Sequence, residues 1–162
     1  MINFFRKPKI YKIRPDETIK LKFEHAVSNC EKKVITQFYE TNYGTNSQGN
    51  NDLADLFNQN LLFSIEKKLK TKVTLKSIWY QKYTQNNYFG YHTHNVSFSG
   101  IYYLNLPSKD LITTFKFKGR EFQPNVDVGD LIIFDGYLPH RSPINTSSCE
   151  KIIVSFNLLS LH

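Results

Sequence analysis

The second half of the chain is a series of short runs rich in β-branched and aromatic residues, and this feature limits the fold more than any other. The runs are separated by Asn, Gly, Pro and Asp, which end strands and form turns. They are TLKSIWYQKY (74–83), NVSFSGIYYLNL (95–106), LITTFKFK (111–118), DLIIF (130–134) and EKIIVSFNLLSL (150–161). Because no helical spacing of apolar residues reappears after Lys72, we expect six to eight strands in this half.

The first part of the chain has a different pattern. Residues 1–22 are expected to be extended, because two prolines interrupt any helix there. From Phe23 onward, apolar residues at spacings of three and four predict one helix that ends near Gly44. A polar loop follows, and Asn51 or Asp52 is the expected N-cap of a second helix. The predicted buried faces of the two helices are Phe23, Val27, Cys30, Val34 and Phe38, and then Leu53, Leu56, Phe57, Leu61, Ile65 and Leu69.

Two helices followed by short strands predict an α+β domain, in which the helices cover one face of a sheet that folds into a sandwich or barrel. No internal repeat divides the chain, and 162 residues are enough to bury a substantial core. We therefore expect a single domain over residues 1–162. Residues 1–72 supply an extended segment and two helices, and residues 73–162 supply the strand-rich core.

The composition narrows the class of protein. Apolar residues make up 40% of the chain and aromatic residues 15%, so the chain is neither disordered nor fibrous. The net charge of +7 comes from scattered lysines, so a nucleic-acid partner is possible but not indicated. No apolar run approaches the ~20 residues that span a membrane, and the first residues lack the order of a secretory signal. With two cysteines far apart in the sequence, these features predict a cytoplasmic protein with no membrane association.

Three histidines are candidate metal ligands. His92 and His94 stand one residue apart in YHTHN. If a strand continues through both, they point to the same face, roughly 6.6 Å apart. Such a pair alone is weak evidence, but His140 follows the DLIIF run between Pro139 and Pro143 and adds a third imidazole from a second strand. Three imidazoles leave coordination positions open, as a catalytic metal site requires.

The last strand has one polar face. Lys151, Ser155 and Asn157 alternate with apolar residues, so they point to the same side of the strand. This face can line a cavity for a carboxylated ligand, with Lys151 as the opposite charge. Ser99 and Tyr103 share a face of the strand that follows the histidine pair and can point into the same cavity. The apolar face, predicted to pack on the helices, consists of Ile152, Val154, Phe156 and Leu158.

The order of these parts resembles the iron(II)- and 2-oxoglutarate-dependent dioxygenases, and within them the prolyl-hydroxylase-like branch. The resemblance rests on an aromatic-rich strand, H-x-H, SGIYYLN, VGDLIIFDGYLPH and a basic residue before IIVSFN, and it covers roughly residues 77–159. It implies a double-stranded β-helix, a jelly-roll barrel over residues 73–162 with N-terminal supporting helices. It also implies Fe(II), 2-oxoglutarate and O2 as cofactors. The implied reaction hydroxylates an unidentified protein side chain or small metabolite and releases succinate and CO2.

The resemblance implies roles for single residues. His92 matches the first iron ligand and His140 the distal one. Lys151 matches the basic residue that pairs with the far carboxylate of 2-oxoglutarate, and Tyr103 matches the tyrosine that hydrogen-bonds the same carboxylate. Tyr83 fits an aromatic position that lines the pocket. No catalytic residue is expected beyond the metal ligands.

His94 departs from the family pattern, in which this ligand is Asp or Glu. A neutral imidazole there leaves the site one unit more positive, which alters its metal preference. Two other functions stay open from the sequence: a non-catalytic jelly roll that binds a metal or ligand, and a three-histidine, cupin-like dioxygenase that needs no 2-oxoglutarate. The substrate, the native metal and the oligomeric state cannot be read from the sequence.

Overall fold

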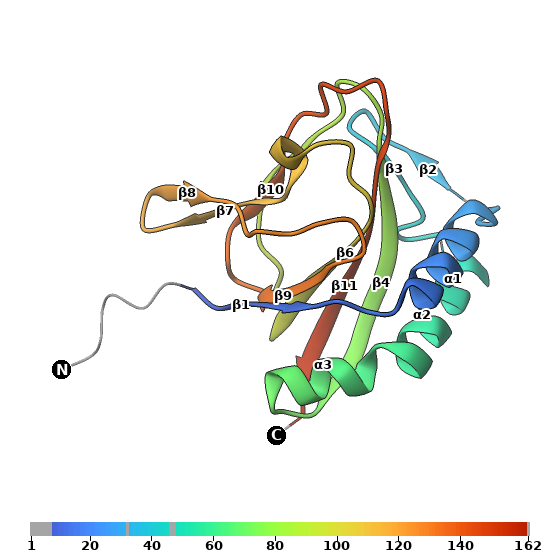
Figure 1. Ribbon diagram of the computed structural model, residues 1–162, viewed down its shortest axis with the longest axis vertical. Helices are drawn as coiled ribbons and strands as arrows, with labels where there is room; N and C mark the ends of the chain where they lie inside the picture. Colours follow the sequence, from blue (N-terminus) through green and yellow to red (C-terminus); the bar gives the residue numbers. More distant parts are fainter. Residues whose placement is uncertain (1–7, 32, 46–47, 162) are drawn as a thin grey trace.

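The computed structural model of the protein describes residues 8–31, 33–45 and 48–161. Eight strands lie between residues 73 and 161, in agreement with the prediction for this half of the chain (Figure 1). In chain order the elements are β1 Ile10–Ile13, α1 Glu17–Ser28, β2 Val34–Ile35, β3 Glu40–Thr41, α2 Gln48–Asn60, α3 Leu62–Leu69, β4 Val73–Tyr83, β5 Phe89–His92, β6 Phe98–Asn105, the short helix η1 Lys109–Leu111, β7 Thr114–Phe117, β8 Arg120–Phe122, β9 Leu131–Asp135, β10 His140–Ser142 and β11 Lys151–Ser160.

Both predicted ends of the first helix are wrong. Helix α1 begins at Glu17 because Asp16 caps it: the Asp16 carboxylate accepts the N–H of Thr18 at 2.8 Å. The helix ends at Ser28, well before Gly44. Local side-chain bonding explains the early end.

The segment after α1 is extended instead of helical. It contains the β-branched run Val34-Ile35-Thr36, and the Thr36 hydroxyl accepts the N–H groups of Phe38 at 3.1 Å and Tyr39 at 2.9 Å. Such side-chain bonds to the backbone compete with helix formation. Residues 36–45, called here the strap, therefore cross the end of the sheet and pair with it through β3.

The second predicted helix is two helices, α2 and α3, interrupted at Leu61. It begins at Gln48, three residues before the predicted cap at Asn51. Its predicted apolar face is confirmed, because Leu53, Phe57, Leu61 and Ile65 are buried and Leu56 and Leu69 pack against the same core.

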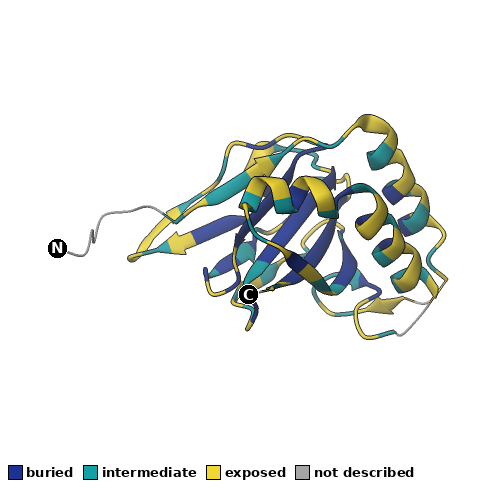
Figure 2. Ribbon diagram, turned by 90° about the horizontal axis from the view of Figure 1, so that it is seen from below, coloured by how far each residue is buried: buried dark blue, intermediate teal, exposed yellow. Residues whose placement is uncertain are grey.

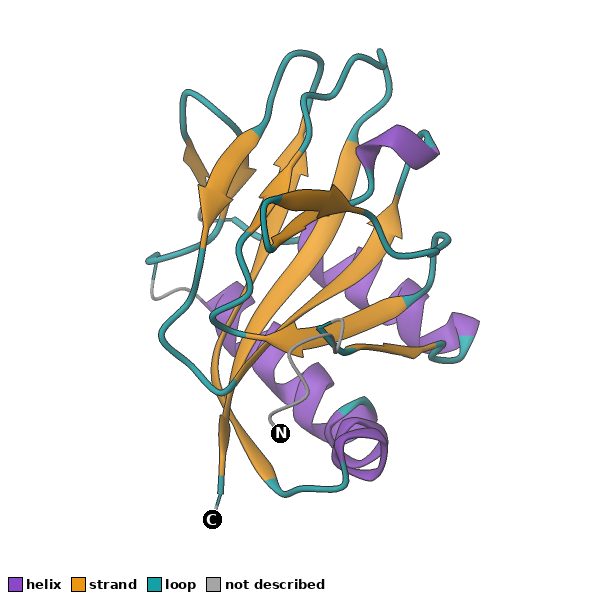
Figure 3. Ribbon diagram, turned by 90° about the vertical axis from the view of Figure 1, so that its left-hand side faces the viewer, coloured by secondary structure: helices purple, strands orange, loops and turns teal. Residues whose placement is uncertain are grey.

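The strands form two antiparallel sheets. The larger sheet has the order β1-β9-β6-β11-β4-β3-β2 and the smaller one the order β5-β10-β7-β8. Over the described residues no strand pairing joins the two sheets. The helices cover the outer face of the larger sheet, as predicted (Figure 1), and Figure 3 shows them behind the strands. Figure 2 shows the helices exposed on their outward sides over strands that are largely buried.

Strand β11 separates the two cores, as its alternation predicts. Val154, Phe156 and Leu158 face the helices, whereas Ile153 belongs to the second core between the sheets. Phe156 packs 4.8 Å from the ring of Phe57. Gly100 on β6 makes room for it, because a Cβ there would lie 2.0 Å from the Phe156 ring. Among the described residues, no helix has the length and apolar character to cross a membrane.

Candidate metal centre

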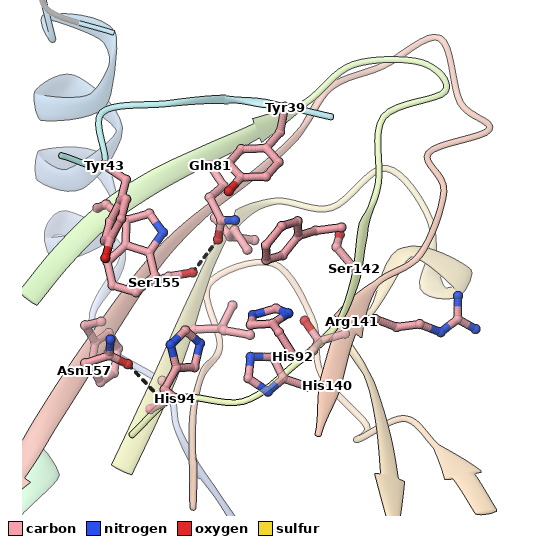
Figure 4. A pocket seen from close by; sticks show the side chains of 18 of the residues that line it. Tyr39, Tyr43, Gln81, His92, His94, His140, Arg141, Ser142, Ser155 and Asn157 are labelled. Atoms are coloured by element: carbon pink, nitrogen blue, oxygen red, sulfur yellow. Dashed lines mark hydrogen bonds between the residues drawn. The ribbon is translucent and has the colours of Figure 1, made fainter. Parts of the chain in front are cut away.

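His92, His94 and His140 meet at one point between the two sheets (Figure 4). Their candidate ligand atoms all lie within 4.8 Å of one another. His92 and His140 are direct cross-strand partners in the β5–β10 pair, with ring centroids 4.3 Å apart. The ring of His94 lies 5.0 Å from that of His92 and 5.2 Å from that of His140. The structure thus brings together the three histidines that the sequence indicated.

The prediction that one strand carries both His92 and His94 is wrong. Strand β5 ends at His92 and does not continue through His94. The His94 N–H instead donates to the carbonyl of Gly136 at 2.7 Å, in the turn between β9 and β10. A side chain at position 136 would clash, because its Cβ would lie 2.4 Å from the carbonyl oxygen of Val96. The turn that precedes His140 therefore also positions His94.

Hydrogen bonds orient two of the imidazoles. Nδ1 of His92 lies 2.8 Å from the carbonyl of Gly90, and Nδ1 of His140 lies 2.9 Å from that of Leu138. A carbonyl only accepts, so Nδ1 carries the hydrogen in both rings. Nε2 is then left with a free lone pair, the form in which histidine binds metals.

Burial keeps the cluster uncharged. Burial, with the neighbouring His92 as a second cause, lowers the pKa of His140 to about 3 and that of His94 to about 4. Burial also lowers the pKa of His92, against the effect of its bond to Gly90. Three neutral imidazoles are a donor set that suits Fe, Ni or Zn. Among the described residues no carboxylate joins the cluster.

Lys151 is buried on the larger sheet beside the histidines. Its Nζ donates to the hydroxyl of Ser142 at 2.8 Å and lies 5.2 Å from the ring centre of Tyr83. No acidic partner faces it among the described residues, and burial lowers its pKa to about 7. The Tyr103 hydroxyl, also buried, donates to that of Thr113 at 2.9 Å, and burial raises its pKa to about 12.

A cavity of about 210 Å³ lies at the histidine cluster. The predicted site residues that line it are His92, His94, His140, Tyr83, Ser99, Ser155 and Asn157. Lys151 and Tyr103 lie next to it, since each hydrogen-bonds a residue that lines it, Ser142 and Thr113. Seven of the nine predicted residues therefore line one cavity, and the other two lie behind its wall.

Solved structures with this architecture were found, although no family model and no curated protein matches the sequence. HygX from Streptomyces hygroscopicus, with nickel and 2-oxoglutarate bound, has a TM-score of 0.71 at 11% identity and covers 93% of this chain and 82% of its own. SnoK, a non-heme alpha-ketoglutarate-dependent carbocyclase from nogalamycin biosynthesis, has a TM-score of 0.74 at 9% identity, covering 96% and 81%. A prolyl-4-hydroxylase from Pseudomonas putida has a TM-score of 0.62 at 13% identity, covering 96% and 95%. The chain has the fold of the 2-oxoglutarate-dependent oxygenases. The resemblance drawn from the sequence is thus confirmed at the level of the fold.

Several residues around the cavity of this oxygenase fold were not predicted. Trp79 and Gln81 alternate with Tyr83 on β4, so the two-residue period of that strand could have revealed them. Ser142 follows His140 at the same spacing. Tyr39 and Tyr43 come from the strap, which the sequence placed in a helix, and no local signal marked them.

Proposed function

We propose that the protein is an iron(II)- and 2-oxoglutarate-dependent oxygenase that hydroxylates its substrate and releases succinate and CO2. One observation carries the proposal: a three-histidine cluster lines one cavity, and a buried lysine without a carboxylate partner lies directly behind Ser142, which lines the same cavity. The two sheets would then form the double-stranded β-helix of this enzyme class, over a single domain of residues 1–162. In support of one domain, the helices and the larger sheet share a continuous core.

The spacing of the charged and metal-binding groups suits 2-oxoglutarate. Ser142, which accepts a hydrogen bond from Lys151, stands two residues after His140 on β10. Two residues of strand span about 6.6 Å. A five-carbon diacid is about as long as two extended residues, roughly 7 Å. A diacid with one end at the histidines therefore places its other carboxylate near Lys151.

Each residue has a role in this proposal. His92, His94 and His140 would hold Fe(II), which when bound supplies the activation of O2 and the oxidative decarboxylation of 2-oxoglutarate. Lys151, with the Ser142 hydroxyl bonded to it, would bind the far carboxylate together with the Tyr103 hydroxyl and fix the pose of the cosubstrate.

The fold does not determine the substrate class, since the similar structures include a prolyl-4-hydroxylase and a carbocyclase of nogalamycin biosynthesis. We therefore keep both a protein side chain and a small molecule as substrate classes. A cytoplasmic location is part of the proposal, supported by the thiol of Cys149, which is exposed and forms no disulfide.

The test is an anaerobic titration of the metal-free protein with Fe(II) and then with 2-oxoglutarate. We expect a weak visible absorption band when the keto acid is added, and its loss with formation of succinate when O2 is admitted. Iron binding without the band would refute the dependence on 2-oxoglutarate and favour a three-histidine dioxygenase or a binding protein. No iron binding would refute the metal site.

Two variants separate the site from nonspecific histidine binding. His140→Ala should abolish iron binding, because it removes one of three ligands. The matched control is His25→Ala, on the exposed side of α1, which should bind iron as the wild type does.

A further inference from the structure

The cavity has two ends, and the proposed cosubstrate can reach only one of them. Lys151 and Asn157 point to the same face of β11, six residues apart, which corresponds to roughly 20 Å along the strand. A five-carbon diacid spans only about 7 Å. If 2-oxoglutarate binds between the histidines and Lys151, as proposed above, Ser99 and Asn157 lie beyond its reach. These two residues, first grouped with the cosubstrate contacts, are then free for another ligand.

An aromatic wall leads from the histidines to this second end. The Trp79 ring lies 6.0 Å from that of His94, and the Tyr43 ring lies 5.0 Å from Trp79 at a steep angle. Trp79 is 7% exposed, whereas Tyr43 on the strap is 60% exposed. The wall therefore begins at the metal centre and ends at the solvent. A flat group could lie against the indole while the rest of its molecule extends past Tyr43.

The amide of Asn157 lies at the same end of the cavity as this aromatic wall. The Ser99 hydroxyl donates to Oδ1 of Asn157 at 2.8 Å, and Nδ2 of Asn157 donates to the hydroxyl of Ser77 at 3.2 Å. An amide nitrogen has two hydrogens, so one N–H of Asn157 remains among the bonds of the described residues. Figure 4 shows Asn157 on the side of the cavity where His94 lies. The buried amide is thus a donor for a carbonyl or hydroxyl oxygen of a ligand.

The charges favour a neutral ligand. Among the described residues, no Asp or Glu lines the cavity, so a cation would have no carboxylate partner there. Lys151 lies behind Ser142, away from Asn157. Arg141 points away from the histidines (Figure 4) and its guanidinium bonds Glu121, so an anion would have no partner at Asn157 either.

We infer that Trp79, Tyr43, Ser99 and Asn157 form the substrate compartment, and that it takes an uncharged ring bearing a carbonyl or hydroxyl group. The ring packs on the Trp79 indole, and its oxygen accepts the remaining N–H of Asn157. Asn157 is then a specificity-determining residue, because it selects a neutral group over a charged one of the same size.

The experiment uses the whole protein loaded with zinc(II) and saturated with 2-oxoglutarate. Trp79 is the one tryptophan in the chain, so its fluorescence reports this compartment directly. The probes are benzamide, benzylamine and benzoate, which share one ring and differ in charge. We expect benzamide to change the emission and to bind at least tenfold more tightly than either charged probe.

The sharper test is Asn157→Asp, which keeps the shape of the side chain and the acceptor for the Ser99 hydroxyl, while the Ser77 hydroxyl would turn to donate to the carboxylate. A carboxylate there should raise the affinity for benzylamine at least tenfold and lower that for benzamide. A purely structural role of Asn157 would not exchange the two preferences. Asn58→Asp, on the exposed side of α2, is the matched control and should bind all probes as the wild type does.

Three outcomes overturn the inference: equal affinity for all probes, a preference for benzylamine in the wild type, or no response of Trp79 to any probe. Binding of 2-oxoglutarate is measured first, by calorimetry on the same sample. If 2-oxoglutarate binds and benzamide does not, the compartment is refuted and the proposed function stands. If 2-oxoglutarate fails to bind, the proposed function is refuted, and benzamide binding then tests the aromatic compartment by itself.

Discussion

The affinity for 2-oxoglutarate should depend on pH through Lys151. Burial lowers the pKa of this lysine to about 7, and no carboxylate partner faces it among the described residues. A ligand carboxylate pairs with the ammonium form, so binding restores the proton and raises the pKa. Below pH 7 the lysine is already charged and the affinity is flat. Above pH 7 the free protein loses the proton, and the Kd should rise about tenfold per pH unit until the lysine of the complex also titrates.

The magnitude follows from the pKa. At pH 9, two units above the pKa of Lys151, the need to reprotonate the lysine should weaken 2-oxoglutarate binding about 100-fold. This corresponds to about 2.7 kcal/mol at 1.36 kcal/mol per pH unit. At pH 8 about nine-tenths of the free protein lacks the proton, so binding of one 2-oxoglutarate should take up about 0.9 proton.

The assay is calorimetry of the zinc-loaded protein in buffers with different heats of ionisation, at pH 6 to 9. Zinc keeps the three histidines from titrating. In Lys151→Arg the cation stays charged over this range, so any remaining affinity should lose its pH dependence. The control is Lys72→Met, which removes an exposed lysine and should behave as the wild type. A constant Kd from pH 6 to 9 with no proton uptake would refute the argument.

Three other perturbations test separate parts of the structure. In the ligand-free protein, Lys151→Met should increase the free energy of unfolding at pH 7, on the order of a few kcal/mol. The lysine pKa is lowered in the folded state, so wild-type stability rises from about pH 7 to 10 and the gain should vanish near pH 10 in denaturant titrations. His94→Asp should raise the affinity for Mn(II) relative to Ni(II), because a carboxylate is the harder ligand; an unchanged ratio in competition titrations would exclude His94 as a ligand. Gly100→Ala should destabilise the fold by about 1–3 kcal/mol, since its Cβ would meet the Phe156 ring, and Phe156→Leu should rescue part of the loss in thermal denaturation.

The local sequence pattern predicted the structure correctly wherever the side chains of one strand or one helix face determine it. The five β-prone runs became β4, β6, β7, β9 and β11. The two faces of β11 separated as the alternation predicts, because a strand has no other way to place successive side chains. The three histidines, Lys151 and Tyr103 could be selected from their order along the chain. In each case the information lies within a few residues of the feature.

The errors lie where competing contacts decide. A helical spacing of apolar residues ran past Ser28, but the Thr36 hydroxyl and the β-branched run favour an extended strap. This error also hid Tyr39 and Tyr43, which reach the cavity only because the strap crosses the sheet. Likewise, His94 joins the cluster through a hydrogen bond to Gly136, and not through the strand period that predicted it.

The amino-acid sequence by itself determined which elements form and which side chains could carry the chemistry. Only the tertiary structure decided how those side chains are charged and which of them meet at one cavity. Lys151 loses its usual pKa because the two sheets close over it, and a burial of that kind depends on contacts between distant strands. His92, His94 and His140 meet the polar face of β11 because the smaller sheet packs against the larger one. Both effects come from packing one sheet on the other, which no short stretch of sequence records.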